Sequence, residues 1–292
     1  VGRRSVAEAD GRSKGLDLEA EYNNRQRVPD HGAVMARWAE RAEGARAAHP
    51  HERIAYGPGP REVLDLFTPE GQPEAPVAVF LHGGYWQALD GQAFHGIAPA
   101  LLSHGVALAL PTYDLAPAVS LGQILRQVRT ATELIRARAG YRPLVLGHSA
   151  GGHMAAALLS EGRAGAAVAI SGVFDLAPLL ETSLNEALRL DRLMATALSP
   201  IHWPVPDGSS PGGTTLDCWV GAGESAEFRR QSHAMADRWG AAGADTRVTE
   251  LPGLNHFTVL DPLFEADSPE VARLVELARE AAGETSREAA PA

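Results

Sequence analysis

Residues Pro143–Gly152 read PLVLGHSAGG, and this stretch decides the fold. Its first four residues form a short apolar run, which is typical of a strand buried on both faces of a parallel sheet. A glycine-rich turn follows, and Gly152–Ser160 then shows an Ala- and Leu-rich helical pattern. The stretch therefore predicts a strand, a tight turn and a helix in immediate succession.

Apolar runs and helical patterns alternate through most of the chain. The other expected strands are Glu62–Phe67, Val77–Leu81, Val106–Leu110, Ala166–Ile170, Leu216–Val220 and Thr246–Leu251. The other expected helices are Phe94–His104, Leu121–Ala139, Ser225–Ala242 and Pro269–Ala282. This alternation predicts an α/β fold in which helices flank a mostly parallel central sheet. In such folds the chemistry lies at the carboxyl ends of the strands.

Two segments depart from this alternation. Residues 1–50 are expected to form an N-terminal helical arm, in which Asp30 stands at an N-cap position and apolar residues recur at helical spacing, at Val34, Met35, Trp38 and Ala42. Residues 171–214 combine a helical pattern near Leu184–Leu198 with the Pro-, Gly- and Ser-rich stretch Pro204–Gly213. We expect this second segment to be a cap-like insertion over the strand ends. The main domain then spans residues 51–285, and residues 286–292 form a tail.

The residues Gly147-His148-Ser149-Ala150-Gly151 have the G-x-S-x-G pattern of a nucleophile elbow, in the strand–turn–helix context that the pattern requires. The turn forces Ser149 into a strained backbone conformation, and side chains at Gly147 or Gly151 would collide with neighbouring elements. The strain lifts the Ser149 hydroxyl clear of the sheet, and the N-terminus of the following helix supplies backbone donors. We therefore expect an α/β-hydrolase fold with Ser149 as its nucleophile.

A second motif, His82-Gly83-Gly84-Tyr85-Trp86, follows the expected strand Val77–Leu81. An acyl-transfer transition state places negative charge on the former carbonyl oxygen, and rigid backbone N–H groups must already point at it. We assign this oxyanion hole to the amides of Gly83 or Gly84, together with Ala150, the residue after the nucleophile. We expect His82 to brace the loop through a hydrogen bond, and Tyr85 and Trp86 to face the pocket or pack the loop.

Hydrolases of this fold carry the nucleophile, the acid and the histidine in that chain order. His256 follows the last expected strand and the turn Pro252-Gly253, where the catalytic base belongs. We expect His256 to accept the proton of Ser149, and we place His153, one turn into the elbow helix, at the edge of the pocket. His202 and His233 are interpreted as solvated or packed histidines.

The acid is expected in the loop after the strand Leu216–Val220. Glu224 is the only carboxylate in the first part of that loop, and a Glu can orient an imidazole as an Asp does. Glu224 is therefore the predicted acid, and Glu227 is its main rival. Asp217 lies inside the strand and Asp245 begins the next one, so both are interpreted as structural.

The composition excludes several classes of partner. The 292 residues include 26 Lys and Arg against 36 Asp and Glu, which gives a formal net charge of −10. This acidic balance argues against nucleic acid or an anionic membrane, because those partners need Lys and Arg on a contact face. Residues 1–10 lack the apolar run of a signal peptide, and no stretch of about 18 apolar residues predicts a membrane span. The expected location is the cytoplasm.

No cofactor and no metal are expected. His31, His49 and His51 are too loosely spaced for a recognisable metal site. Cys218, the only cysteine, lies in an apolar stretch and is interpreted as a small buried thiol. The expected partner is a small-molecule ester or amide substrate, and a homodimer is left open.

The motifs resemble those of the α/β-hydrolase kynurenine formamidases, or arylformamidases, and their bacterial relatives. The resemblance rests on HGGYW at 82–86 and GHSAGGH at 147–153, and it continues through EYNN at 21–24, SGVFDL at 171–176, TSLN at 182–185 and ESAEF at 224–228. It therefore covers residues from about 20 to 260. The family's triad acid aligns with Glu224, where Asp is common, and its usual Pro is replaced here by Ala226.

This resemblance implies a serine hydrolase that converts N-formylkynurenine to kynurenine and formate through an acyl-enzyme, with a triad of Ser149, Glu224 and His256. An aryl-shaped pocket would suit an aryl formamide or an aryl ester, and its expected lining is Tyr85, Trp86, Phe174 and Phe257. A carboxylesterase acting on small acyl or aryl esters is therefore the alternative. A binding protein without catalysis is disfavoured, because all three triad residues are present in the right order.

Overall fold

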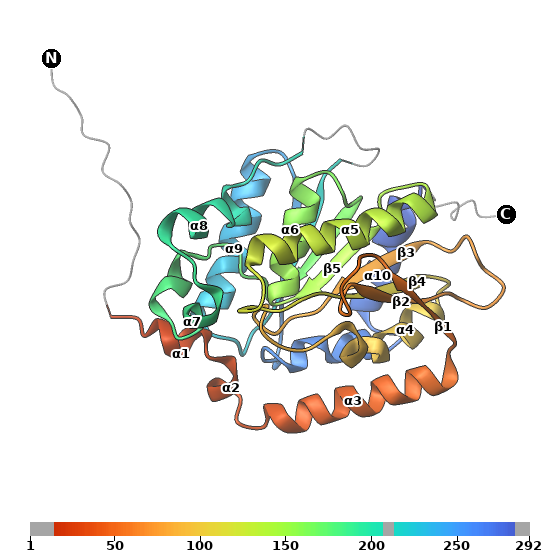
Figure 1. The fold of residues 1–292 in the computed structure, drawn as a ribbon, viewed down its shortest axis with the longest axis horizontal. Coiled ribbons are helices and arrows are strands. Elements are labelled where there is room, and N and C mark those ends of the chain that lie inside the picture. The colour runs from red at the N-terminus through yellow and green to blue at the C-terminus, as the bar shows by residue number, and fades with distance from the viewer. Residues whose placement is uncertain (1–14, 207–212, 284–292) are drawn as a thin grey trace, which may run out of the picture.

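The computed structural model describes residues 15–206 and 213–283. The expected tail at 286–292, the start of the arm and part of the Pro-, Gly- and Ser-rich stretch lie outside the described residues. Within the described residues, eight strands form one sheet in the order β1-β2-β4-β3-β5-β6-β7-β8 (Figure 1). The neighbours of β2 pair with it antiparallel, and all other pairs are parallel. The mostly parallel sheet expected from the sequence is confirmed.

The strands are β1 (His51–Ala55), β2 (Val63–Phe67), β3 (Val77–Leu81), β4 (Ala107–Thr112), β5 (Leu144–His148), β6 (Ala166–Ile170), β7 (Thr215–Gly221) and β8 (Asp245–Leu251). Every predicted strand is present within a few residues of its expected bounds. The additional strand β1 was not predicted. Its sequence, HERIA, is largely polar and half-exposed, and it is a strand because it pairs with β2 at the edge of the sheet.

The helices of the described residues begin with α1 (Leu18–Tyr22), α2 (Asn24–Arg27), α3 (His31–Ala48), α4 (Ala98–Leu102), α5 (Leu121–Ala139) and α6 (Ala150–Ser160). They continue with α7 (Asn185–Leu188), α8 (Arg192–Ala197), α9 (Ala226–Ala241) and α10 (Pro269–Ala281). The 3₁₀ turns are η1 (Gly91–Ile97), η2 (Ala177–Glu181), η3 (Pro200–His202) and η4 (Thr258–Phe264).

Two expected helices are broken in the structure. The stretch Phe94–His104 is divided between η1 and the short helix α4. The stretch Leu184–Leu198 forms α7 and α8, because Arg189 adopts a left-handed conformation with φ of 53°. The side chain of Asn185 then bonds both the N–H and the carbonyl of Leu190, and this closes the break. Helix α3 begins after Asp30 as predicted, but the Asp30 side chain makes no capping hydrogen bond.

The strands divide the core into two apolar clusters, one on each face of the sheet. Along β3, Val79 and Leu81 belong to the cluster covered by α5, α6 and α9. The alternate residues Ala78 and Phe80 belong to the cluster covered by α3, α4 and α10. This alternation follows from the period of two of a strand. Both faces of the sheet are thus covered by helices, and the carboxyl ends of the parallel strands lie together at one end of the sheet.

The arm and the insertion meet beside those strand ends. Helix α1 packs against α9 and η2, whereas α3 packs along η1. Figure 1 shows α3 lying along the lower side of the molecule, with α1 and α2 leading into it from the side of α7 and α9. Residues 18–27 therefore lie beside elements that are far from them in sequence. No helix within residues 15–206 and 213–283 combines the length and the apolar character that a membrane-crossing helix needs.

Candidate active site

Ser149 lies at the sharp turn between β5 and α6. Its backbone has φ of 56° and ψ of −114°, and its N–H donates to the carbonyl of Ile170 at 2.8 Å. The flanking glycines are required by close packing. A Cβ on Gly147 would lie 2.3 Å from the oxygen of Gly151, and a Cβ on Gly151 would lie 1.9 Å from the oxygen of Leu81. The local sequence therefore dictates the strained turn expected of a nucleophile elbow.

The glycine loop after β3 passes directly over this turn. A Cβ built on Gly83 would lie 3.2 Å from the Cβ of Ser149, and Gly84 has φ of 99°, which favours glycine. Within the described residues, the amides of Gly83, Gly84 and Ala150 donate to no acceptor. For Ala150 this follows from its place in the first turn of α6. Gly83 and Gly84 in the loop next to Ser149, and Ala150 directly after it, thus keep uncommitted backbone donors, which an oxyanion hole requires.

His82 braces this loop, as expected from the sequence. Its Nδ1–H donates to the carbonyl of Gly83 at 2.9 Å, and its ring stacks on Tyr113 with the centroids 4.0 Å apart. The Tyr113 hydroxyl in turn donates to the carbonyl of His82 at 2.7 Å. Complete burial lowers the pKa of His82 to about 4, so this ring is neutral and structural.

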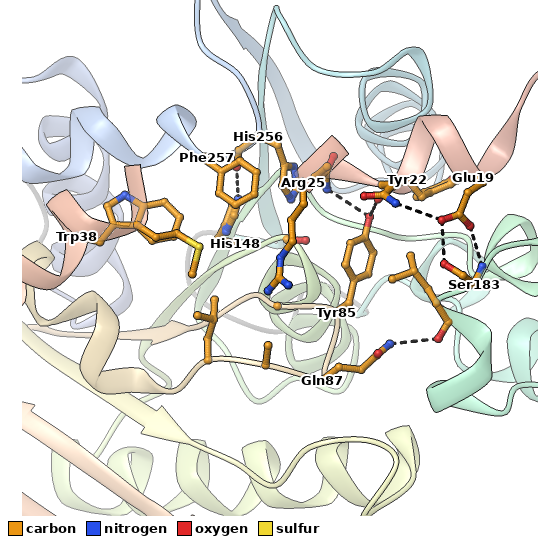
Figure 2. A pocket seen from close by; sticks show the side chains of 18 residues that line it. Glu19, Tyr22, Arg25, Trp38, Tyr85, Gln87, His148, Ser183, His256 and Phe257 are labelled. Atoms are coloured by element: carbon orange, nitrogen blue, oxygen red, sulfur yellow. Dashed lines mark hydrogen bonds between the residues drawn. The ribbon is translucent and has the colours of Figure 1, made fainter. Parts of the chain in front are cut away.

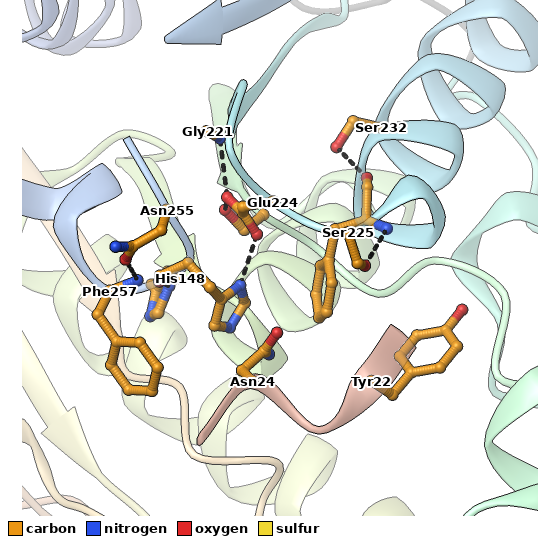
Figure 3. A network of polar contacts seen from close by, with 12 residues as sticks. Tyr22, Asn24, His148, Gly221, Glu224, Ser225, Ser232, Asn255 and Phe257 are labelled. Atoms are coloured by element: carbon orange, nitrogen blue, oxygen red, sulfur yellow. Dashed lines mark hydrogen bonds and ion pairs between the residues drawn. The ribbon is translucent and has the colours of Figure 1, made fainter. Parts of the chain in front are cut away.

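Glu224 and His256 form a buried pair at the ends of β7 and β8. One carboxylate oxygen, Oε2, accepts from Nδ1 of His256 at 2.6 Å. The other oxygen, Oε1, accepts from the N–H of Gly221 at 2.8 Å and from the Ser171 hydroxyl at 2.5 Å (Figure 3). The Glu224 side chain is fully buried and that of His256 is 6% exposed. Glu224 therefore holds the proton of His256 on Nδ1 and leaves Nε2 free to accept another.

Two residues of this arrangement were missed in the sequence. The His148 Nε2–H donates to the carbonyl of His256 at 2.8 Å and so fixes the loop that carries the base. Burial, with the nearby His256, lowers the pKa of His148 well below its usual value, which keeps its ring neutral. Ser171, with φ of 51°, presents its hydroxyl to Glu224. Both residues lie within recognised motifs, GHSAGGH and SGVFDL, but neither motif reveals these long-range contacts.

The rival acids have other partners. Glu227 bonds to the Tyr22 hydroxyl at 2.8 Å and to the guanidinium of Arg230, and it makes no contact with His256. Asp217 accepts two hydrogen bonds from Arg273, at 3.0 and 3.2 Å. Both carboxylates are therefore committed to structural ion pairs.

Ser149 and His256 line one cavity of about 310 Å³ (Figure 2). Tyr85 and Phe257 also line it, as the sequence predicts. A large part of the wall comes from residues 19–25 of the arm, a segment to which the sequence assigned no pocket residue. The family-like stretch EYNN at 21–24 was the one available signal for this contribution.

Three residues that the sequence suggested for substrate binding do not line this cavity. Trp86, His153 and Phe174 are all completely buried in the core. The ring of Trp86 meets the ring of His153 edge-on, with centroids 5.1 Å apart, and His153 Nε2–H donates to the carbonyl of Leu198 at 2.7 Å. Positive φ angles at Tyr85 and Trp86 turn the chain sharply, so Tyr85 reaches the cavity while Trp86 enters the core.

His51, Asp65 and His95 bring their ligand atoms within 4.8 Å of one another, a spacing that could hold a metal ion. None of the three lines the cavity with Ser149. His95 Nε2–H donates to Asp65 at 3.0 Å, and Arg53 Nε lies 3.5 Å from the other oxygen of Asp65. Arg46 lies 3.5 Å from His95 Nδ1. The guanidinium of Arg53 thus partly offsets the buried charge of Asp65, and that of Arg46 stands against His95, so two positive groups beside the cluster oppose a further cation.

The chain is similar to characterised proteins over most of its length. It is 29% identical over 252 residues to a kynurenine formamidase of Salmo salar, which covers 82% of this chain and 85% of that protein. It is 28% identical over 237 residues to a kynurenine formamidase of Drosophila melanogaster, which covers 74% of this chain and 78% of that protein.

A solved structure and a family model show which fold family the chain belongs to. A protein of Silicibacter sp. tm1040, provisionally described as a thioesterase, is 33% identical and superposes with a TM-score of 0.79, covering 88% of this chain and 98% of that one. Residues 78–260 match the model of a family with the α/β hydrolase fold. These residues are more than half of the chain and include Ser149, Glu224 and His256. The chain therefore belongs to the α/β-hydrolase fold family.

Proposed function

We propose that this chain is a serine hydrolase that cleaves an aryl formamide such as N-formylkynurenine to an aryl amine and formate. The observation that carries the proposal is the buried Glu224–His256 pair, of which His256 lines the same cavity as Ser149 at its strained turn. The similarity to two kynurenine formamidases over most of both chains supports the choice of substrate.

In the proposed mechanism, the Ser149 hydroxyl attacks the formyl carbon. His256 Nε2 accepts the hydroxyl proton, while Glu224 keeps the Nδ1 proton in place and stabilises the resulting imidazolium. The amides of Gly83 or Gly84 and of Ala150 hold the negative oxygen of the tetrahedral intermediate.

The intermediate then collapses by breaking the carbon–nitrogen bond. His256 returns its proton to the leaving nitrogen, and the aryl amine departs from a formyl ester of Ser149. Water attacks this ester after giving a proton to His256, and formate leaves as Ser149 regains the proton. Each step uses the same base and the same backbone donors.

The walls of the cavity suit an aromatic substrate. Its volume of about 310 Å³ is in the range of small-molecule sites. Tyr85, Phe257 and Trp38 contribute aromatic surface to its lining, and Phe257 and Trp38 also contact each other with ring centroids 6.1 Å apart. Aromatic side chains favour stacked or edge-on contacts with an aryl ring.

A comparison of substrates tests the proposal. We would measure kcat/KM for N-formyl-L-kynurenine, 4-nitrophenyl acetate and 4-nitrophenyl butyrate, with Ser149→Ala as the blank. A formamide value of about 10⁴ M⁻¹s⁻¹ or more, above both esters, is the expected result. Ester turnover with negligible formamide cleavage would instead favour the carboxylesterase alternative, with the same mechanism.

A further inference from the structure

Arg25, on α2, lines the cavity that contains Ser149 and His256. Within the described residues, its guanidinium has no hydrogen-bond or ion-pair partner. Figure 2 shows its side chain directed into the cavity, on the side of Tyr85. Arg27, two residues further along the same helix, lies 3.5 Å from the carboxylate of Glu21. Arg25 is thus an uncommitted cation at the site, whereas its neighbour is paired.

The other charged side chain of the cavity wall, apart from the histidines, is already engaged. Glu19 accepts from the N–H of Ser183 at 2.7 Å and from its hydroxyl at 2.8 Å. These hydrogen bonds lower the pKa of Glu19, so it is a carboxylate that joins the arm to the insertion. Of the two charged side chains in the cavity wall apart from the histidines, Arg25 is therefore the one that remains available to bind a ligand.

The segment that carries Arg25 is held firmly against the cavity wall. The Tyr85 hydroxyl donates to the carbonyl of Tyr22 at 2.6 Å, and the Asn24 side chain donates to the same hydroxyl at 3.3 Å. The Tyr22 hydroxyl is itself bonded to Glu227 at 2.8 Å and accepts from Gln231 at 2.6 Å. These buried contacts fix the backbone on which Arg25 stands. The backbone thereby places Arg25 at the cavity, and its exposed side chain is free to orient on a ligand.

We propose that Arg25 binds a carboxylate on the leaving-group side of the substrate, so that the site selects aryl formamides that carry an amino-acid side chain over neutral ones. This inference rests on the proposed function, because it assigns a specificity residue for that reaction. A guanidinium is suited to the task, since its planar fork donates two parallel hydrogen bonds to a carboxylate. The aromatic part of the molecule would then lie between Arg25 and Ser149.

The test separates binding from turnover by using a Ser149→Ala background. Titration calorimetry would give the Kd of N-formyl-L-kynurenine and of N-(2-acetylphenyl)formamide, which keeps the aryl formamide and lacks the amino acid. Arg25→Met should weaken binding of the first compound about 10- to 100-fold and change binding of the second less than about 2-fold. Arg25→Lys should restore part of the loss. Arg27→Met is the matched control, because Arg27 does not line this cavity, and it should change neither Kd.

The same substitutions with Ser149 present give a second readout. Arg25→Met should raise KM for N-formyl-L-kynurenine by a similar factor, with kcat nearly unchanged. That KM should also rise with salt, because the charge is partly exposed, and the KM of the neutral analogue should not.

The outcomes distinguish the two proposals. Equal effects of Arg25→Met on both compounds, no effect on either, or no binding of N-formyl-L-kynurenine would overturn the role of Arg25. Arg25-dependent binding without turnover in the unsubstituted protein would leave that role in place and refute formamide hydrolysis.

Discussion

Replacing Glu224 by Gln tests the proposed triad most directly, because the change keeps the shape of the side chain and reverses one hydrogen bond. In the protein, Oε1 of Glu224 accepts from two donors, the N–H of Gly221 and the hydroxyl of Ser171. The amide oxygen of Gln must take this position, since an NH₂ group there would face both donors. The NH₂ group then occupies the place of Oε2, 2.6 Å from Nδ1 of His256.

An NH₂ donor at that position requires Nδ1 of His256 to accept. The ring proton must then move to Nε2, and Nε2 can no longer accept the proton of Ser149. A wrong tautomer of this kind lowers kcat by about 10⁴-fold in a comparable triad. At about 1.36 kcal/mol for each factor of ten, the loss corresponds to roughly 5.5 kcal/mol of transition-state stabilisation.

The assay is kcat/KM at pH 7.5 for N-formyl-L-kynurenine and for 4-nitrophenyl acetate, with folding checked by thermal melting. Glu227→Gln is the matched control. Its carboxylate contacts Tyr22 and Arg230 but not His256, so we expect a change in kcat of less than about 3-fold. A Glu224→Gln variant that keeps more than about a tenth of the activity would refute the tautomer argument. A loss of kcat in Glu227→Gln that exceeds the loss in Glu224→Gln would show that the acid is misassigned.

Three further predictions concern stability. Gly151→Ala should lower the free energy of unfolding by about 3 kcal/mol or more and reduce activity, because the added Cβ would lie 1.9 Å from the oxygen of Leu81. Urea unfolding measures the stability and a kinetic assay measures the activity. Unchanged values would contradict the packing argument. Burial lowers the pKa of His153 from 6.5 to about 4. As the pH falls through this range, the unfolded chain binds a proton at His153 and the folded chain does not. The free energy of unfolding therefore drops by about 3 kcal/mol because of this residue. His153→Gln should reduce the pH slope of the unfolding free energy in that window by up to one proton, and an unaltered slope would show that the ring is already charged. Tyr22→Phe should cost about 1–3 kcal/mol through its lost hydrogen bond to Glu227, and an unchanged melting temperature would mean that this contact does not hold the arm.

The sequence alone predicted those parts of the fold that depend on local pattern. Buried parallel strands such as Val77–Leu81 and Ala166–Ile170 are continuous apolar runs, and each is recognisable without its neighbours. The turn at Ser149 is equally local, because its glycines are required by contacts within the turn and with the adjacent strand. Chain order then led to Glu224 and His256, which the structure brings into hydrogen-bond contact.

Only the tertiary structure decided which side chains form the wall of the cavity. Tyr85 and Trp86 are consecutive aromatic residues, and two positive φ angles, which no propensity predicts, send one to the cavity and the other into the core. Arg25 reaches the site because α1 docks on α9 and η2, through contacts between residues that are far apart in sequence. Local patterns fix strands, turns and helices because their causes lie within a few residues. The composition of a pocket depends on how distant segments pack, and that information is spread over the whole chain.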